Sequence, residues 1–312
     1  HQADVVVVNT CGFIGPAKEE SIQAILEAHR LKEEGRCRAV IATGCLAQRY
    51  QEELQIELPE ADQILPLAEE GNIAAHVDRA LGRTRAGYIT SGPRLQLTPR
   101  HWAYLRISDG CDHQCAFCAI PAIRGKHHSE PVEQLVSEAR RLAAGGVREL
   151  VLVSQDSVRY GADLYGRAQL VPLMEQLGAI EGIEWLRLMY TYPAFWTEEM
   201  IALFAGHPKV CAYIDMPLQH IADPVLRRMK RATTRQKTLD LLDGLRQRIP
   251  GVGLRSSFIV GFPGESEEQF KELLEFVEQP RFDYATAFIY SPEEGTSAHG
   301  LDGEVDEEIK AE

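Results

Sequence analysis

Three cysteines lie close together near the middle of the chain. Cys111, Cys115 and Cys118 form the spacing CxxxCxxC within the segment SDGCDHQCAFCAIP. Structural zinc usually takes four ligands, often as two separated pairs, whereas an iron–sulfur cubane binds one thiolate per iron. The spacing therefore favours a cubane with one open iron. The alternative is a structural zinc site whose fourth ligand is a nearby histidine: His113, His127 or His128.

Four further cysteines are spread along the chain. Cys11 stands in NTCGF and Cys45 in TGCL, each directly after an apolar run, while Cys37 and Cys211 match no ligand pattern and are interpreted as core or surface thiols. No apolar run approaches the ~18 residues that a membrane span needs, and the first residues do not resemble a signal peptide. We therefore expect a soluble, cytoplasmic protein with free thiols rather than disulfides.

Composition and charge are those of a globular protein. The chain has 312 residues, of which 45% are hydrophobic and 25% charged, and its net charge is −13. At roughly 150 residues per domain, this length predicts about two domains. Between residues 265 and 312 there are 15 acidic and three basic residues, so most of the net charge belongs to this last segment. Such acidity disfavours nucleic acid and favours basic partners.

The first ninety or so residues alternate strands with helices. A buried strand is predicted from Asp4 to Asn9 because its four consecutive valines have no helical periodicity. An amphipathic helix is predicted from Pro16 to Glu34, and a second strand from Arg38 to Thr43. This order is typical of an open parallel α/β sheet, whose ligands bind at the carboxyl ends of its strands. Cys11 and Cys45 both follow such ends.

A linker is predicted from Ser91 to Arg100, and strand–helix repeats follow it. Helices are expected at Val132 to Ala144, Leu170 to Leu177 and Thr234 to Arg248. Six strand–helix units predict a partial TIM-type (β/α)6 barrel with its chemistry at the carboxyl ends of the strands. The six predicted strands are Ala103 to Ile107, Glu149 to Ser154, Trp185 to Leu188, Ala212 to Met216, Leu254 to Val260 and Tyr284 to Tyr290.

At the central cysteines the chain resembles the radical S-adenosylmethionine (SAM) enzymes. Their CxxxCxΦC motif has an aromatic residue at the position of Phe117. The resemblance implies a 4Fe-4S cluster on Cys111, Cys115 and Cys118, with the methionine part of SAM on the open iron. It also implies that the reduced cluster cleaves SAM to a 5′-deoxyadenosyl radical and that Phe117 packs near the adenine.

Cys11 and Cys45 narrow the resemblance to the methylthiotransferase family. Its amino-terminal domain holds a second 4Fe-4S cluster on three cysteines, of which the first would precede His1. We therefore expect the chain to be cut at its start and to hold the second cluster incompletely. The expected domains are an amino-terminal domain over 1–92, the barrel over 97–290, and an acidic segment over 291–312 that leads to an absent carboxyl-terminal TRAM domain.

Several strings resemble the RimO-type branch, which modifies an aspartate of ribosomal small-subunit protein twelve. They are CDHQCAFCAIPAIRG, SQDSVRYGADLYG, LRLMYTYP, DMPLQH and LRSSFIVGFPGE. The branches that act on transfer RNA are expected to have SQN in place of SQD. A transfer-RNA methylthiotransferase and a zinc-stabilised binding module without catalysis are the alternatives. The resemblance also implies a flavodoxin-type electron donor and a sulfur carrier as partners.

The resemblance assigns further roles residue by residue. Gln155 and Asp156, after the second barrel strand, would bind the methionyl amino group, and Arg255 would pair with the methionyl carboxylate or form an ordinary ion pair. Gly261, in FIVGFPGE, would let the backbone approach the adenine, although Glu265 stands one place later than in the superfamily pattern. Four residues are expected to face the substrate: Tyr160, Tyr165, Gln219 and His220. The alternatives are that His220 is a structural histidine and that the two tyrosines only pack in their loop.

Overall fold

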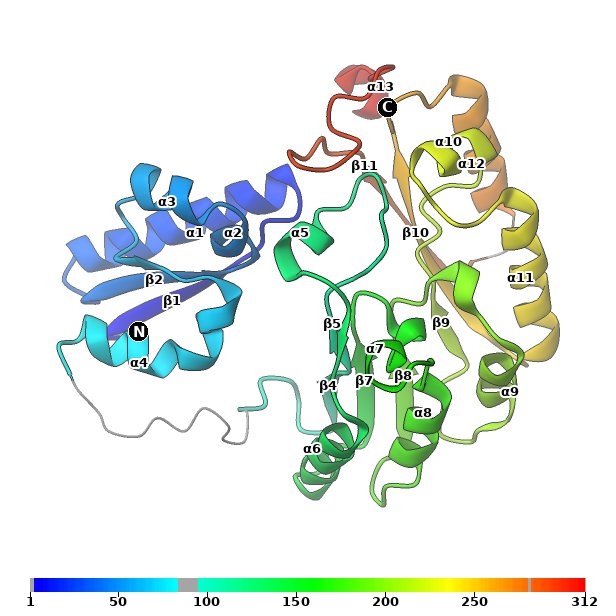
Figure 1. Cartoon of the computed structure of the whole chain (residues 1–312), viewed down its shortest axis with the longest axis horizontal. Helices are drawn as coiled ribbons and strands as arrows, with labels where there is room; N and C mark the ends of the chain where they lie inside the picture. The colour runs from blue at the N-terminus through cyan, green and yellow to red at the C-terminus, as the bar shows by residue number, and fades with distance from the viewer. Residues whose placement is uncertain (1–2, 84–94, 280–281, 312) are drawn as a thin grey trace. The chain divides into compact units, whose positions relative to one another are not determined.

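The structure is a computed structural model that describes residues 3–83, 95–279 and 282–311 (Figure 1). It divides into two compact units. The first comprises His1–Leu95, Cys118–Arg124 and Ser291–His299, and the second contains the rest of the chain. The part of the predicted linker before residue 95 lies outside the described residues.

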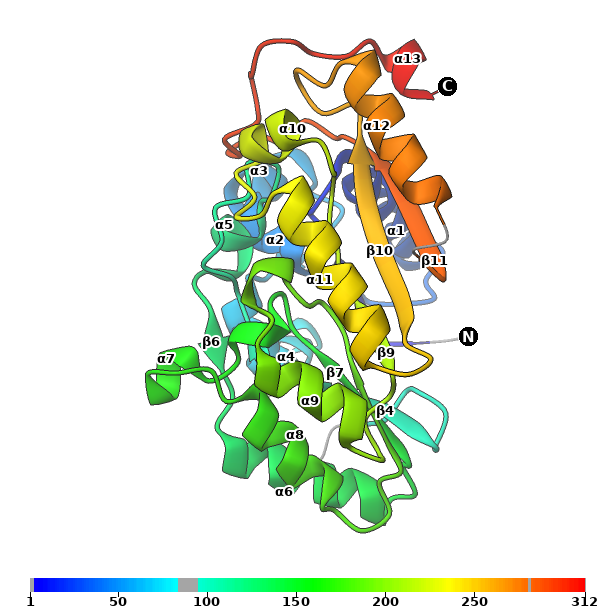
Figure 2. The same cartoon turned by 90° about the vertical axis from the view of Figure 1, so that its right-hand side faces the viewer.

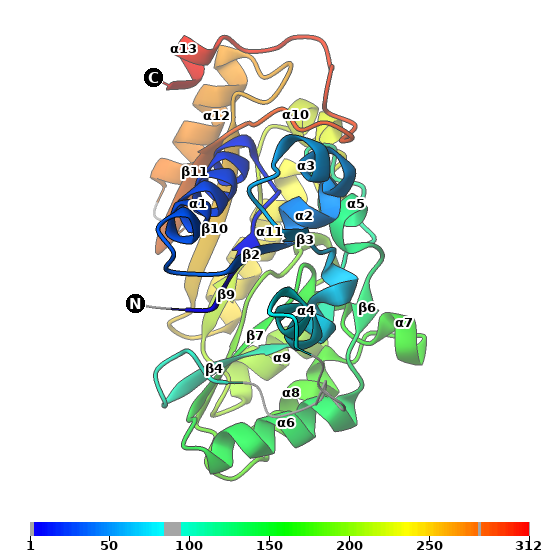
Figure 3. The same ribbon diagram turned by 90° about the vertical axis from the view of Figure 1, so that its left-hand side faces the viewer.

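The first unit is built on a parallel sheet of order β1-β2-β3. The strands are β1 (Val5–Thr10), β2 (Ala39–Gly44) and β3 (Gln63–Ile64). Every residue of the central β2 is buried, as expected of a strand covered on both faces. Helices α1 (Gly15–Glu33) and α4 (Ile73–Ala80) lie on opposite faces of this sheet (Figure 3).

Short helices follow the strand ends of the first unit. Helix α2 (Cys45–Arg49) begins directly after β2, and α3 (Gln51–Glu57) follows it, with the 3-10 helix η1 (Leu67–Asn72) after β3. Helix α5 (Ile120–Arg124) contacts α2 within the same unit. The segment Ser291–His299 also belongs to this unit, although the sequence suggests only an acidic connection there.

The second unit is a partial barrel of parallel strands. One sheet has the order β4-β7-β8, and a parallel bridge between Leu186 and Val210 connects it to a second sheet of order β9-β10-β11. The predicted class, an open α/β sheet followed by a partial (β/α)6 barrel, is confirmed. Its strands are β4 (Trp102–Arg106), β7 (Glu149–Val153), β8 (Trp185–Leu188), β9 (Tyr213–Asp215), β10 (Gly253–Val260) and β11 (Tyr284–Ile289).

Helices cover the outside of this barrel, and Figure 2 shows them succeeding one another along it. They are α6 (Val132–Ala144), α8 (Leu170–Gly178), α9 (Glu198–Gly206), α11 (Arg235–Arg248) and α12 (Glu267–Glu278). Side-chain caps start three of them: Thr197 and Thr234 accept from backbone N–H groups, and Ser266 forms a capping box with Gln269. One apolar core is formed by the strands and these helices together: Leu105 and Leu152 of the strands are buried in it, as are Leu135 and Leu245 of the helices.

The remaining elements are short and belong to the loops at the strand ends. Among the described residues, no helix is long and apolar enough to cross a membrane. The short elements are β5 (Ser108–Asp109), β6 (His128–Ser129), η2 (Ser157–Arg159), α7 (Ala162–Tyr165), η3 (Pro193–Phe195), α10 (Asp223–Arg228) and α13 (Glu307–Ala311).

Candidate active site

The cysteine loop, residues 110–118, follows β4 and β5 at the carboxyl end of the first barrel strand. Two backbone hydrogen bonds fix its path. The N–H of Cys111 donates to the carbonyl of Gly125 at 3.1 Å, and the N–H of Ala116 donates to the carbonyl of Met229 at 2.9 Å. The loop is therefore held at the barrel edge where this fold places its chemistry.

Gly110 begins the loop in the left-handed region, with φ of +72°. A Cβ at this position would collide with the carbonyl oxygen of Lys126. We therefore expect Gly110→Ala to displace the loop and to lower the iron bound per chain after anaerobic reconstitution, measured by iron analysis and cubane absorption. Gly251→Ala is the control, because Gly251 has φ of +68° but open space around its Cβ position, and it lies between α11 and β10 rather than in the loop. Equal iron content in the two variants would contradict this expectation.

The three cysteines of the loop are thiols that are not joined in disulfides. Cys111 is buried, and Cys115 and Cys118 are partly exposed. Burial raises the pKa of the Cys111 thiol to about 11; the N–H of His113 opposes this, whereas Asp156, Cys115 and Asp112 reinforce it. Thiolates are the metal-binding form, so metal binding has to release this proton.

The number of thiols in the loop matches what a 4Fe-4S cluster with one open iron requires. Among the described residues, no three His, Cys, Asp or Glu side chains lie close enough together to hold one metal ion. In a cubane each cysteine binds a different iron, so the thiolates stay apart from one another. Three cysteine thiols carried by one loop fit the donor set of a 4Fe-4S cluster with one open iron.

Gln155 and Asp156 follow β7 and carry buried oxygen atoms without partners. Asp156 is 2% exposed, and its Oδ2 lies 2.7 Å from Nε2 of His113 in the cysteine loop. Within the described part of the chain, Oδ1 of Asp156 and Oε1 of Gln155 have no hydrogen-bond partner. Unsatisfied buried acceptors call for a donor, and the amino group of SAM is a donor of the required kind.

Arg255 on β10 forms an ion pair with Asp215 on the neighbouring strand. Its guanidinium lies 2.9 Å from Oδ1 of Asp215, which is 1% exposed, whereas the Arg255 side chain is 34% exposed. This pair is the ordinary alternative to a contact with the SAM carboxylate, although the exposed part of Arg255 is accessible to a ligand. Gly261, after β10, has φ of +70°, which explains a glycine there.

Two of the residues assigned to the substrate lie in the interior of the structure. Tyr160 and His220 are both fully buried. The hydroxyl of Tyr160 donates to the carbonyl of Glu130 at 2.7 Å. Nδ1 of His220 accepts from the N–H of Ala222, and its Nε2 lies 2.9 Å from Glu265. Their polar atoms are hydrogen-bonded within the protein, which agrees with the alternative of a structural role; a contact of either residue with the substrate stays a prediction.

The other predicted residues are more accessible. Tyr165 is 43% exposed, and its hydroxyl accepts from the N–H of Val132 at 3.2 Å. Gln219 has φ of +74°, unusual for a residue other than glycine. Its N–H donates to the carbonyl of Ser257 on β10, and its carbonyl accepts from the N–H of Ile259 on the same strand. Phe117 is half-buried in the cysteine loop. A substrate role for Tyr165 and Gln219, and a SAM contact for Phe117, remain predictions.

Tyr192 is a site residue that sequence reasoning missed. Its ring stacks on that of His113, with centroids 4.0 Å apart and planes 16° apart. It is 7% exposed, and its hydroxyl accepts from the N–H of Ala232 at 3.1 Å. The available signal was its place in LRLMYTYP, just past the end of β8, where side chains face the chemistry of such a barrel.

Cys11 and Cys45 lie next to each other at the edge of the first sheet. The register pairs Thr10 with Gly44, so each cysteine is the first residue beyond a paired strand end. Arg124 on α5 donates from its guanidinium to Sγ of Cys45 at 3.4 Å.

By contrast, Cys37 is buried in the core of this unit, as expected of a residue without a ligand role. Cys211 is partly buried, and burial raises the pKa of its thiol.

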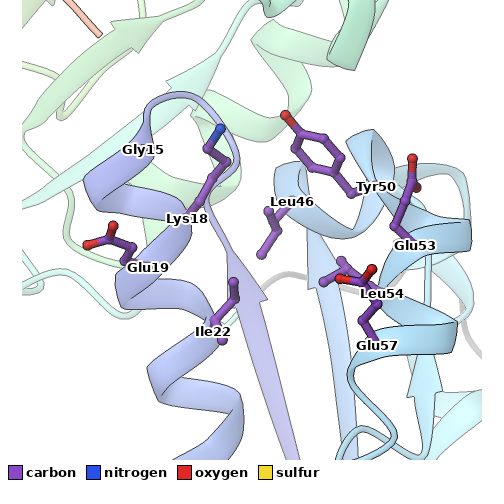
Figure 4. A pocket seen from close by; sticks show the side chains of 9 residues that line it. All are labelled: Gly15, Lys18, Glu19, Ile22, Leu46, Tyr50, Glu53, Leu54 and Glu57. Carbon is purple, nitrogen blue, oxygen red and sulfur yellow. The ribbon is translucent and has the colours of Figure 1, made fainter. Parts of the chain in front are cut away.

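A hollow of about 420 Å³ lies on the first unit between α1, α2 and α3 (Figure 4). Across it, Nζ of Lys18 lies 5.5 Å from the centre of the Tyr50 ring. The hollow is lined by Gly15, Lys18, Glu19, Ile22, Leu46, Tyr50, Glu53, Leu54 and Glu57. None of these residues is one of the cysteines or one of the predicted site residues, although Leu46 directly follows Cys45 in the chain.

Known proteins that are similar to this chain define the class of protein to which it belongs. The Radical SAM superfamily matches residues 105–277, and Uncharacterized protein family UPF0004 matches residues 1–66. The solved structure of the radical SAM methyltransferase TsrM from Kitasatospora setae, with cobalamin and a 4Fe-4S cluster bound, is similar, with a TM-score of 0.66 and 16% identity over 94% of this chain and 66% of that one. The chain is therefore a radical SAM protein, and this family implies a 4Fe-4S cluster and SAM.

Curated relatives narrow the class. A ribosomal protein uS12 methylthiotransferase RimO from Desulforamulus reducens is 50% identical over 99% of this chain and 72% of its own length. The protein of the same name from Geobacter sulfurreducens is 46% identical over 100% of this chain and 72% of its own length. The chain belongs to this RimO family of methylthiotransferases, as the sequence motifs predict, and the zinc-module and transfer-RNA alternatives are not supported.

Proposed function

We propose that this protein methylthiolates the ribosomal protein uS12, replacing a β-carbon hydrogen of one aspartate by a methylthio group. Relatives named for that activity, 45–50% identical over nearly the whole chain, carry this proposal. The net charge of −13 agrees with it, because an acidic surface attracts a basic ribosomal protein and repels RNA phosphate. A ribosomal substrate would place the activity in the cytoplasm.

The residues of the barrel would position the reactants. Cys111, Cys115 and Cys118 would hold the cluster, which when bound supplies the electron that cleaves SAM. The free acceptor atoms of Gln155 and Asp156 would bind the methionyl amino group, and the exposed part of Arg255 would reach its carboxylate. The buried ring of Tyr192 would exclude water beside the cysteine loop.

We further propose that Cys11 and Cys45 belong to a second 4Fe-4S cluster that carries the transferred sulfur. Their adjacent register and the guanidinium of Arg124 beside Cys45 support this role, because a cationic donor favours thiolate sulfur. The reaction also needs an electron donor, for which a flavodoxin-type reductant is suited, and a carrier that replaces the sulfur.

The substrate is tested with anaerobically reconstituted protein, SAM and a reductant. We expect uS12, but not transfer RNA, to gain the mass of one methylthio group. Cys115→Ala should abolish both this gain and the formation of 5′-deoxyadenosine, because one cluster ligand is lost. Labelling of transfer RNA alone would overturn the proposed substrate, and SAM cleavage by Cys115→Ala would overturn the assignment of that ligand.

A further inference from the structure

Arg231 places a positive charge against a sulfur atom of the cysteine loop. One terminal nitrogen of its guanidinium donates to Sγ of Cys115 at 3.5 Å, and the other donates to the carbonyl of Pro217 at 2.7 Å. No carboxylate forms an ion pair with Arg231 among the described residues. The charge therefore acts on the sulfur without an acidic partner to neutralise it.

The surroundings hold this guanidinium in place. Its central carbon lies 4.1 Å from the centre of the Tyr192 ring, close enough for a strong cation–π contact. Tyr192 in turn stacks on His113, which is bonded to the buried Asp156. The chain around Arg231 is also tied to the loop, since the carbonyl of Met229 accepts from the N–H of Ala116. The orientation of the arginine is thus built into the barrel.

We propose that Arg231 is a positioning residue that raises the reduction potential of the cluster bound at Cys115. Reduction adds one electron, and therefore one negative charge, to a centre already ligated by thiolates. A fixed cation that donates to a ligand sulfur stabilises the reduced form more than the oxidised form, and hydrogen bonds to sulfur are among the main determinants of cluster potential. Arg231 would thereby bring the cluster within reach of a biological one-electron donor.

The test is a redox titration of the reconstituted protein with dithionite, followed by the EPR signal of the reduced cluster. Arg231→Met removes the charge and keeps an unbranched chain. We expect the equilibrium constant for reduction to fall about tenfold, which is about 59 mV for a one-electron couple. Arg231→Lys keeps the charge but loses the planar donor, so its shift should be smaller and in the same direction.

Arg227→Met is the matched control, because Arg227 lies on α10, is exposed, and changes the net charge equally. The reduction potential of the cluster in Arg227→Met should equal that of the wild type. The titration reports only on chains that hold a cluster, so it distinguishes tuning from a structural role even when loading falls. If Arg231→Met loses iron and its remaining clusters keep the wild-type potential, the proposal is wrong.

This inference depends on the cluster and not on the identity of the methylthiolated substrate. A wild-type protein that cleaves SAM but modifies transfer RNA would overturn the proposed substrate and leave the role of Arg231 intact. Conversely, unchanged potentials in both Arg231 variants would overturn the inference alone.

Discussion

Replacement of Glu293 by alanine should lower the free energy of unfolding by about 3–5 kcal/mol, the usual cost of removing one partner from a buried ion pair. Glu293 is 1% exposed. One of its oxygens lies 2.8 Å from both Nζ of Lys18 and the guanidinium of Arg49, and the other accepts from the hydroxyl of Ser291 at 2.9 Å. Alanine would leave two cations without their carboxylate. Urea unfolding followed by circular dichroism measures the loss.

The neighbouring acid provides the control. Glu294 is exposed, and only its backbone carbonyl accepts from Arg49, so Glu294→Ala should change the free energy of unfolding by less than about 0.5 kcal/mol. Similar losses of unfolding free energy in the two variants would show that the buried ion pairs of Glu293 do not contribute the expected stability.

The contribution of Glu293 should depend on pH in a defined direction. Burial alone would raise the pKa of its carboxyl, but hydrogen bonds from Lys18, Ser291 and Arg49 outweigh burial and lower it. A pKa lowered by folding contributes stability that is present above the unfolded value of about 4.3 and is lost as the pH falls through the folded value. The difference between wild type and Glu293→Gln should therefore be constant near pH 7 and shrink below about pH 4. A difference that grows in acid would contradict this assignment.

Glu293 also helps to hold the two loops that carry Cys11 and Cys45. Arg49 is the last residue of α2, which begins at Cys45, and its guanidinium donates to the carbonyl of Gly12, next to Cys11, at 2.8 Å. A single buried carboxylate thus fixes the arginine that connects the two cysteine-bearing loops. Loss of Glu293 should loosen both positions as well as the fold.

The strands and helices of this protein were predictable because burial patterns are local. The strand Trp185–Leu188 and the helix Val132–Ala144 match their predicted bounds, and the other strand ends differ by one residue or so. Glu293 could not be found in this way. Its partners Lys18 and Arg49 stand 275 and 244 residues away, and in the sequence it is one acid among 15 in an acidic run. Only the structure distinguishes the buried Glu293 from the exposed acidic residues around it.

In the candidate site, too, local patterns were predictable from the sequence, whereas burial and contacts between distant residues were not. The spacing of Cys111, Cys115 and Cys118 identifies their chemistry without a structure, because three thiols so close together have few other uses. Tyr160 and His220 have side chains capable of chemistry, but residue type does not reveal exposure, and both are buried with their polar atoms hydrogen-bonded within the protein. Arg231 was missed for the opposite reason, since its contact with Cys115 spans 116 residues of sequence.

The substitution Asp156→Asn should reduce the rate of SAM cleavage about 10- to 100-fold. Asparagine keeps the shape of Asp156 but removes its charge and one of its two acceptor oxygens, so it cannot both face His113 as Oδ2 does at 2.7 Å and accept from the SAM amino group as assigned to Oδ1. Loss of one charge-assisted hydrogen bond in a buried site costs about 1–3 kcal/mol, which corresponds to this range. Formation of 5′-deoxyadenosine per bound cluster measures it. Asp240→Asn, the same change on the exposed face of α11, should have no effect.

Two outcomes distinguish what Asp156 does. If it binds SAM, Asp156→Asn should slow SAM cleavage whether or not uS12 is present, and a higher SAM concentration should restore part of the rate. If it instead selects the substrate, SAM cleavage should stay at the wild-type rate while methylthiolation of uS12 falls. The second result would contradict the SAM assignment and would explain why this position carries aspartate where asparagine is expected in the branches that modify RNA.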